Sequence, residues 1–237
     1  MTRRFSLVGR GRAGGALHHA LSAKGWTCND VFGRGDDITD AANGVDVCIV
    51  AVPDGAIADV AAQVEPDDAV VVHLSGATSV GVLGEHRSAG LHPLASLADA
   101  ERGAEILTSA YFAVGGDPIA EEMAELLSGK WFRIDDEDRV LYHAAAAVAS
   151  NHLGALLGQV ERIAAEIGVP FEAFVPLVWS SVQNVSELGP AAALTGPAAR
   201  GDEETISAHL GELNERMPDE VAAYEALVAE ARRLASS

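Results

Sequence analysis

Three glycines near the start of the chain constrain its fold more than any other feature. The loop reads G-x-G-x-x-G (GRGRAG), with Gly9, Gly11 and Gly14 between the apolar run Phe5–Val8 and a helical stretch of residues 14–24. After a strand and before a helix, the first glycine allows a tight turn and the second lets a pyrophosphate approach the backbone. The third permits close packing of helix on strand. The pattern therefore predicts a dinucleotide at the N-terminus of that helix.

Short β-branched runs alternate with Ala-rich helical stretches through the first part of the chain, which is typical of a parallel sheet covered by helices. One run, Val45–Val52, is apolar on both faces, as expected of an inner parallel strand. The predicted strands are Phe5–Val8, Cys28–Phe32, Val45–Val52 and Ala69–Leu74, with weaker ones at Tyr111–Val114 and Trp131–Ile134. We predict an α/β protein whose residues 1–135 form a Rossmann domain, a doubly wound parallel sheet that binds NADP.

The sequence pattern changes at the acidic run DDED of residues 135–138, after which no further strands are predicted. A long helical stretch is expected from about Arg139 and is Ala- and Leu-rich over residues 142–167. Prolines then separate shorter helices, and an amphipathic helix closes the chain at Asp219–Leu234. We predict that residues 136–237 form an all-α domain for substrate binding and homodimerisation. The DDED run lacks the glycine-containing spacing of a calcium loop, so we interpret it as a solvated linker and predict no metal site.

Charge and hydropathy exclude several classes of partner. The chain has 16 Lys+Arg against 35 Asp+Glu, a formal charge of −19, and such a surface repels nucleic acid and anionic membranes. No stretch approaches the ~18 apolar residues of a membrane span, and the N-terminus lacks the apolar region of a signal peptide. We expect a soluble cytoplasmic protein, with Cys28 and Cys48 as small apolar side chains and no disulfide.

The cofactor is predicted to be NADP(H) rather than NAD(H). After the second predicted strand, where an acid would bond the ribose of NAD, the chain reads VFGRGDD and presents Arg34. A guanidinium there can bind a 2′-phosphate with two hydrogen bonds. Two alternatives stay open: Arg34 pairs with Asp36 or Asp37, or one of these acids contacts a ribose. Within the loop itself, the cofactor-binding candidates also include Arg12 and Ala13.

Further cofactor-binding candidates follow the third and fourth predicted strands, because ligands of open α/β sheets bind at the carboxyl ends of strands. The sequence VPDGAI places Val52, Pro53 and Asp54 there, and HLSGA places Ser75 and Gly76 in the same region. Asp54 alternatively caps the next helix. Ser75 binds the nicotinamide amide or a substrate carboxylate, or it is a turn residue.

These segments resemble a known family of bacterial Rossmann-like proteins whose C-terminal half is a domain of unknown function. The resemblance is carried by GRGRAGG, VAVPDGAI, HLSGA, LHPLASL, YHAAAAVASNHL and ALTGPAARGD, and it spans nearly the whole chain. That family is similar to ketopantoate reductases, pyrroline-5-carboxylate reductases and 6-phosphogluconate or β-hydroxyacid dehydrogenases. The resemblance implies an NAD(P)-dependent oxidoreductase that holds a small substrate between a nucleotide domain and a helical, dimerising domain.

The candidate catalytic residues are His92, His143 and Asn151. The resemblance places His92 in a His-Pro loop beside the substrate, where histidine could supply the proton that an alkoxide needs. His143 and Ser150 are seven residues apart on one helix face, and Asn151 would orient the substrate carbonyl. Each histidine has the alternative of a purely structural role. Related reductases carry a catalytic lysine one turn before the asparagine, where this chain has Ala147, so Tyr142 or water could replace it.

The segment LTGPAARGD supplies the last candidates, Thr195 and Arg200, as binding groups for a substrate carboxylate. Arg200 alternatively forms a salt bridge with a neighbouring acid. The leading expectation is an NADP(H)-dependent reductase of a small carboxylate-bearing 2-oxo acid, with ketopantoate as the first guess. The alternatives are an imine reductase of pyrroline type, which the absent lysine favours, and a non-catalytic NADP-binding protein.

Overall fold

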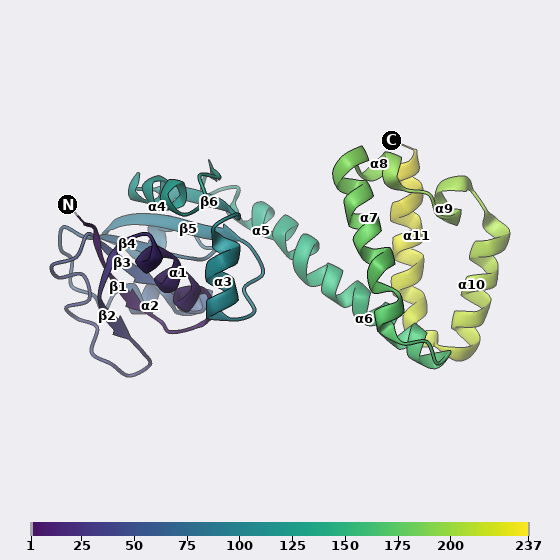
Figure 1. The fold of residues 1–237 in the computed structure, drawn as a ribbon, viewed down its shortest axis with the longest axis horizontal. Helices are drawn as coiled ribbons and strands as arrows, with labels where there is room; N and C mark the ends of the chain where they lie inside the picture. Colours follow the sequence, from purple (N-terminus) through teal and green to yellow (C-terminus); the bar gives the residue numbers. More distant parts are fainter. Residues whose placement is uncertain (1, 237) are drawn as a thin grey trace. The chain divides into compact units, whose positions relative to one another are not determined.

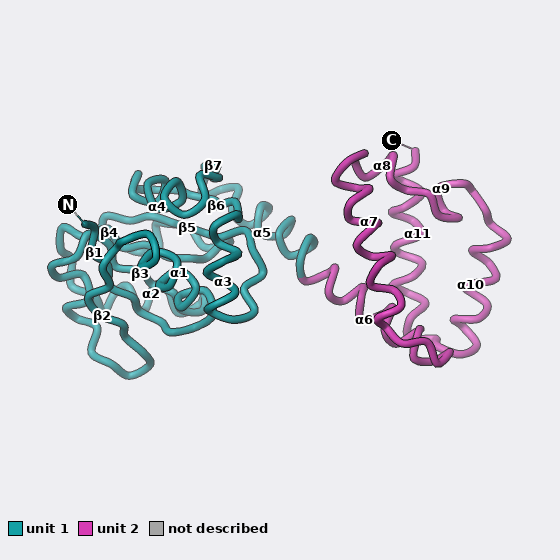
Figure 2. Tube along the Cα trace, viewed as in Figure 1, with its two compact units in different colours: residues 1–150 teal, residues 151–237 magenta. Residues whose placement is uncertain are grey.

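The computed structural model describes residues 2–236 and divides the chain into two compact units (Figure 2). The first unit extends to Ser150 and the second begins at Asn151. This division falls within the long helical run Arg139–Glu166, beyond the start of the predicted helical domain at residue 136. The beginning of that run therefore belongs to the unit that contains the sheet.

The first unit is built on a seven-stranded sheet with the order β2-β1-β3-β4-β5-β6-β7 (Figure 1). Its strands β1 to β5 are parallel, β6 is antiparallel to β5, and β7 is parallel to β6. The strands are β1 Arg4–Val8, β2 Thr27–Phe32, β3 Val47–Val50, β4 Val70–His73, β5 Arg87–Leu94, β6 Tyr111–Gly116 and β7 Trp131–Arg133. The predicted α/β fold class is confirmed, with a mostly parallel sheet.

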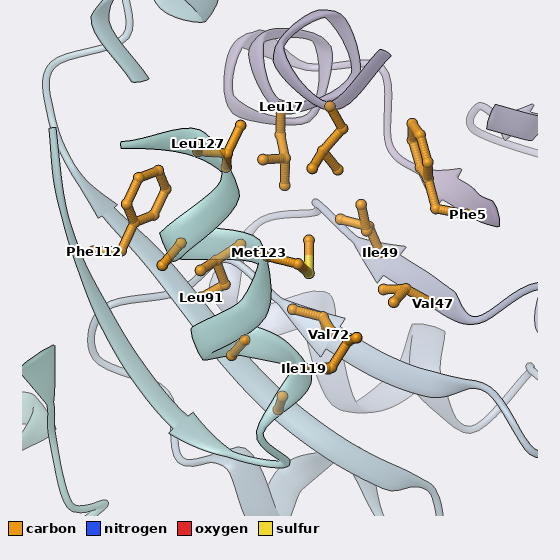
Figure 3. Packing of buried hydrophobic residues seen from close by; sticks show 14 of the residues in the cluster. Phe5, Leu17, Val47, Ile49, Val72, Leu91, Phe112, Ile119, Met123 and Leu127 are labelled. Carbon is orange, nitrogen blue, oxygen red and sulfur yellow. The ribbon is translucent and has the colours of Figure 1, made fainter. Parts of the chain in front are cut away.

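Helices cover both faces of this sheet. Alternate side chains of each buried strand point to opposite faces, so Val70 and Val72 join one core cluster and Val71 joins the other. The helices α1 Arg12–Ala23, α3 Ala100–Leu107 and α4 Ile119–Leu127 contribute to the first cluster. Figure 3 shows Leu17 of α1 and Met123 of α4 in this cluster. The second cluster includes side chains of α2 Ile57–Ala61 and of the 3-10 turn Val80–Leu83. The sheet is thus held from both sides at its strand centres, and its carboxyl edge carries the polar loops.

The segment LHPL is not a loop, and this corrects the sequence-based expectation. His92 and Pro93 lie within β5 and pair with Ala113 and Phe112 of β6. Proline is tolerated because the pairing of β5 with β4 ends at Gly90, and beyond that point no β4 partner requires a backbone N–H. His92 is consequently fixed on a strand rather than on a mobile connection.

All regular elements from residue 139 onward are helical, as predicted. The long run consists of α5 Arg139–Ala147, a π turn Val148–His152 and α6 Leu153–Glu166. The remaining elements are the 3-10 turns Phe171–Ala173 and Pro218–Glu220 and the helices α7 Val175–Leu188, α8 Pro190–Ala193, α9 Pro197–Arg200, α10 Glu203–Arg216 and α11 Val221–Ala235. The sequence predicts a continuous α-helix over residues 142–167, and the π turn divides it into two α-helices.

Within the second unit, α6 is tied to the turn before α11 by polar contacts. The buried amide of Gln159 donates to the carbonyl of Glu220 at 2.9 Å. Arg162 donates to both carboxylate oxygens of Glu220, with its Nη2 at 2.9 Å from Oε2. These bonds lower the pKa of Glu220 below its ordinary value and fix the position of the turn on α6.

One helical run in the described residues, Arg139–Glu166, is long and apolar enough by length and composition to cross a membrane. The expectation that no stretch comes near this length is therefore corrected. The reason is that many alanines keep its mean hydropathy high although His143, Asn151 and His152 interrupt the apolar sequence. A single helix of this kind is weak evidence for a membrane span, because helices of soluble proteins pass the same test.

Candidate active site

The glycine loop connects β1 to α1 and has the geometry that a dinucleotide requires. Gly9 has φ +110°, and a Cβ atom there would lie 2.3 Å from the carbonyl oxygen of Ala51. A Cβ on Gly14 would lie 2.3 Å from the carbonyl oxygen of Gly9. Both positions therefore require glycine for close packing between the loop, α1 and the end of β3.

Gly11 differs from the other two glycines because a Cβ atom there would meet nothing within 4 Å. Open space thus lies over Gly11, the residue directly before α1. The backbone N–H groups in the first turn of this helix have no side-chain cap. A helix N-terminus with free N–H groups favours an anion, and a phosphate group fits this position. The loop residues present therefore fit a dinucleotide, with Arg12 and Ala13 opening α1.

The strand order reverses between β1 and β3, and such a switch point is where ligands bind in open α/β sheets. Parallel pairing brings the carboxyl ends of β2, β1, β3 and β4 to one edge of the sheet. The predicted cofactor residues follow these four ends: Arg34 after β2, the glycine loop after β1, Val52, Pro53 and Asp54 after β3, and Ser75 and Gly76 after β4. The structure thus gathers all of them along one edge.

Arg34 follows β2, and the side chain of Arg10 reaches the end of that strand from the glycine loop. The side chain of Arg10 donates to the carbonyl of Val31 at 2.7 Å, and Asp36 accepts from the backbone N–H of Gly33 at 2.6 Å. Arg10 is also 3.4 Å from Asp36. Arg34 is exposed and makes no ion pair within residues 2–236, so the alternative in which it pairs with Asp36 or Asp37 is not the arrangement found.

The alternatives for Asp54 and Ser75 have different outcomes. Asp54 opens the 3-10 turn Asp54–Ala56 but makes no capping hydrogen bond, so the helix-cap interpretation is wrong and its carboxylate is exposed. Ser75 is buried and behaves as a turn residue: its Oγ accepts from the backbone N–H of Thr78 at 3.0 Å. Its role in ligand binding stays a prediction.

A cluster of polar rings lies at the carboxyl end of β4 and β5. The Nδ1 atom of His92 and the hydroxyl of Tyr142 are 2.7 Å apart, and the ring centroids of His92 and His143 are 5.9 Å apart. A Cβ atom on Gly76 would lie 2.9 Å from a ring carbon of each histidine. The loop after β4 thus packs directly on the imidazoles, and His92, His143, Tyr142 and Gly76 form one group of neighbours.

Burial shifts the proton equilibria of this group. It lowers the pKa of His92 to about 4, helped by the nearby charge of His143, and it lowers the pKa of His73 on β4 to about 4 as well. Burial also raises the pKa of Tyr142 to about 12. At neutral pH both buried histidines are therefore uncharged and Tyr142 holds its proton. A neutral His92 ring is thus a hydrogen-bond partner rather than a ready proton donor, and its catalytic role stays a prediction.

Two further residues that the sequence does not single out for this site, Asp136 and Arg139, lie beside the group. Asp136 is exposed, as expected for the acidic run, but it is also hydrogen-bonded: it accepts from the hydroxyl of Ser79, from the backbone N–H of Val80 at 3.0 Å and from Arg139 Nε at 2.8 Å. Arg139, the first residue of α5, is fully buried. The strand glycines Gly90 and Gly115 mark this close approach in the structure, but the sequence predicts neither of them inside a strand, so this signal could not be read in advance.

The π turn contains Ser150 and Asn151. Because a π turn follows i to i+5 hydrogen bonding, the α-helical spacing that would put His143 and Ser150 on one face does not extend across it. Single π turns inside α-helices are frequent at functional sites. Ala147 ends α5 directly before the turn, so the lysine position of related reductases precedes this irregular backbone.

The candidates Thr195 and Arg200 lie in the second unit, where both are exposed. Arg200 donates to the carbonyl of Thr195, and its Nη2 is 3.8 Å from Asp202. The salt bridge weighed in the sequence analysis is thus present as a loose contact. Their carboxylate-binding role stays a prediction. Among the described residues, no group of three or more His, Cys, Asp or Glu is placed to hold a metal ion.

Fold and loop together define the class of this protein: a Rossmann-type unit with a dinucleotide-type glycine loop, followed by a helical unit. The chain belongs to the family described as Domain of unknown function (DUF2520), which matches residues 111–231, just over half of its length. This confirms the resemblance drawn from the motifs. No curated protein matches the chain.

Solved structures share the fold over nearly the whole chain. A candidate NADP oxidoreductase from Bacteroides fragilis is 22% identical with a TM-score of 0.84, and the match covers 98% of each chain. A protein from Thermotoga maritima is 28% identical with a TM-score of 0.80 and the same coverage. A reductive aminase from Aspergillus terreus, in complex with NADPH and ethyl levulinate, is 17% identical with a TM-score of 0.74, covering 100% of this chain and 98% of its own.

Proposed function

We propose that the protein is an NADP(H)-dependent oxidoreductase. The observation that carries the proposal is the glycine loop at the switch point of the sheet, where two glycines are sterically required and the third faces open space. The similar chains from Bacteroides and Aspergillus, an NADP oxidoreductase candidate and an NADPH-bound reductive aminase, support it. When bound, the cofactor supplies a hydride; the residues of this chain bind it, orient the substrate and handle a proton.

The preference for NADP(H) over NAD(H) rests on Arg34. Its guanidinium is exposed after β2. Asp36 forms its ion pair with Arg10 instead, so Arg34 is available for a 2′-phosphate. We expect Arg34→Ala to weaken NADPH binding by about tenfold or more while NADH binding changes little. The matched control is Lys24→Ala, which removes an exposed positive charge at the opposite end of α1. Equal loss in both variants would contradict the assignment.

The proposed substrate is a small carbonyl compound that carries a carboxylate, with a branched 2-oxo acid such as ketopantoate tested first. Ser75, Thr195 and Arg200 are the proposed carboxylate-binding groups, and Asn151 on the π turn is proposed to orient the carbonyl. An imine substrate of pyrroline type is the second candidate, favoured by Ala147 in place of a lysine and by the similarity to a reductive aminase.

A substrate panel separates these possibilities, with NADPH consumption as the measurement. Turnover of 2-oxo acids supports the leading proposal, and turnover of cyclic imines supports the second. A protein that binds NADPH and turns over neither class would be a non-catalytic NADP-binding protein instead.

We propose Tyr142 as the group that delivers the proton to the substrate, with His92 holding its hydroxyl at 2.7 Å and His143 beside them. The pKa of His92, about 4, keeps its ring neutral near pH 7, so His92 serves as a hydrogen-bond partner rather than as the proton source. We expect Tyr142→Phe to lower kcat by about 10²-fold or more while NADPH affinity stays unchanged. An unchanged kcat would remove Tyr142 from this role.

A homodimer formed through the helical unit is also proposed. Its described part buries only four side chains, Gln159, Ala164, Ile206 and Glu220, so by itself it has almost no apolar core. Large apolar side chains of α7 are exposed at the same time, including Leu177, Trp179 and Leu188. A second copy of the chain would cover them. We also propose that the protein works in the cytoplasm, as its acidic, disulfide-free sequence indicates.

A further inference from the structure

Arg139 is a charged side chain buried to an unusual degree. It has 0% relative exposure, and its Nε donates to Asp136, but Nη1 and Nη2 have no hydrogen-bond partner among the described residues. A buried guanidinium with two unbonded nitrogens is expensive in free energy. Such a group in a folded protein calls for a specific explanation.

Two glycines make room for this guanidinium in the middle of the sheet. Gly90 of β5 and Gly115 of β6 are direct partners in the antiparallel pair. A Cβ atom would lie 2.8 Å from Arg139 Nη2 at Gly90 and 2.5 Å from it at Gly115. Neither glycine has a positive φ, so space rather than backbone freedom is what the two positions provide. Glycine at these two strand positions thus leaves the space that the positively charged guanidinium of Arg139 occupies.

The charge lies close to the ring cluster of the candidate active site. Tyr142 follows Arg139 by three residues on α5, and residues three apart are neighbours on a helix surface. The charge of Arg139 counteracts the effect of burial on Tyr142, lowering a pKa that burial raises. The same charge lowers the pKa values of His73 and His92.

We propose that Arg139 is a positioning residue for the Tyr142–His92 pair, whose buried positive charge stabilises the tyrosinate that remains when Tyr142 gives up its proton. This inference rests on the proposed reductase function. In the reduction, the Oη–H bond of Tyr142 breaks and a new bond forms between that proton and the substrate oxygen or nitrogen, which carries the electron pair left by hydride addition. Solvent returns a proton to Tyr142 before the next turnover.

Other charges act on the same pair and have to be separated from Arg139. His92 also responds to His143 on α5 and His73 on β4, which lower its pKa, and to the carboxylate of Asp54 after β3, which raises it. His73 responds to Asp54 and Asp136 in the same upward direction. A variant that changes only Arg139 leaves all of these groups in place.

The test is a pH titration of the histidine resonances by NMR in the full chain, with His92 assigned from a His92→Gln variant. We expect Arg139→Met to raise the His92 midpoint measurably and Arg139→Lys to keep it near the wild-type value, because only the lysine preserves the positive charge. The matched control, Arg133→Met, removes an exposed arginine of β7 and is expected to leave the midpoint unchanged. Coincident midpoints in wild type and Arg139→Met would overturn the proposal.

A second readout follows Tyr142 directly. With a fluorinated tyrosine incorporated and observed by fluorine NMR, Arg139→Met is expected to raise the pH at which Tyr142 ionises. If Arg139→Met does not fold, Arg139→Gln replaces it with the same expected increase in the His92 and Tyr142 midpoints, and unshifted midpoints would overturn the proposal.

None of these measurements needs cofactor or substrate, so they are independent of the proposed function. A titration shift in a protein that fails to bind NADPH would contradict the reductase function and leave the coupling of Arg139 to the rings intact. NADPH binding without any titration shift would contradict the coupling of Arg139 to the rings and leave the reductase function intact.

Discussion

At the scale of single residues, Gly11 and Gly14 share a loop but differ in what a methyl group would meet. A Cβ on Gly14 meets backbone at 2.3 Å, whereas one on Gly11 meets nothing within 4 Å. We expect Gly14→Ala to reduce the free energy of unfolding by about 1–3 kcal/mol, because backbone must move. Gly11→Ala should change it by no more than about 0.5 kcal/mol. Urea denaturation measures both, and equal effects would contradict the loop geometry.

The buried histidines make stability depend on pH in a defined window. His73 and His92 have a pKa of about 4 in the fold against 6.5 in the unfolded chain, so between these values the unfolded state binds more protons. Stability therefore falls as the pH drops from 6.5 towards 4, by up to about 3 kcal/mol for each histidine.

Urea denaturation at a series of pH values checks this slope in the wild type and in His92→Gln. The variant lacks one of the two groups, so its unfolding free energy should fall by about half as much over the window. Paired carboxylates such as Asp136 have a lowered pKa, so their contribution to the free energy of unfolding is lost only at lower pH. A flat profile between pH 6.5 and 4.5 would contradict the burial of the two rings.

The sequence predicts some of these residues and not others, for a physical reason. The glycine loop is local, and each glycine has a role that its spacing and neighbours define. The contact between His92 and Tyr142 depends on how β5 pairs and how α5 packs, which join residues 50 positions apart. No local pattern records that contact, so the sequence indicates Tyr142 only as a substitute donor and Arg139 only as the start of the long helix.

At the scale of elements, the contact between α6 and the turn Pro218–Glu220 is a specific source of stability for the helical unit. Gln159 is 6% exposed and donates to the carbonyl of Glu220. We expect Gln159→Leu to lower the free energy of unfolding by about 1–3 kcal/mol, because that carbonyl loses its partner. The control Gln183→Leu, on an exposed position of α7, should change it little. A near-neutral Gln159→Leu would show that water replaces the amide.

Strands with continuous apolar runs are predicted correctly, and irregular elements are not. The runs at β1, β3 and β4 are buried on both faces, so hydropathy alone identifies them. In contrast, β5 reads RSAGLHPL, and its glycine and proline are typical of a turn. The π turn Val148–His152 leaves no compositional trace in an Ala-rich helix. Both exceptions lie beside candidate active-site residues.

At the scale of the whole molecule, the exposed apolar face of α7 predicts self-association. Trp179 is 66% exposed, although burying a side chain of this size is strongly favourable. We expect sedimentation to show a dimer at micromolar concentration and Trp179→Glu to shift it towards monomer. The control Ile106→Glu, which adds the same charge at an exposed apolar position of α3, should leave the dimer intact. A wild-type monomer would contradict the proposal.

The division into an α/β part and a helical part is legible in the sequence because strand periodicity stops and alanine-rich helices begin. The substrate cannot be read from the sequence in the same way: the proposed substrate-binding residues Arg200 and Asn151 have neighbours that are set by packing rather than by spacing. The formal charge of −19 disfavours binding to a phosphate backbone, but it does not select among small molecules.

The most direct test of the account is a titration of wild type and Gly11→Ala with NADPH and NADH, followed by nicotinamide fluorescence. We predict saturable binding to the wild type, tighter for NADPH, and loss of binding in Gly11→Ala with the fold unchanged, because the added methyl group occupies the space open to the phosphates. Absence of binding to the wild type, or equal binding by the variant, would contradict the assignment of this loop as the cofactor site.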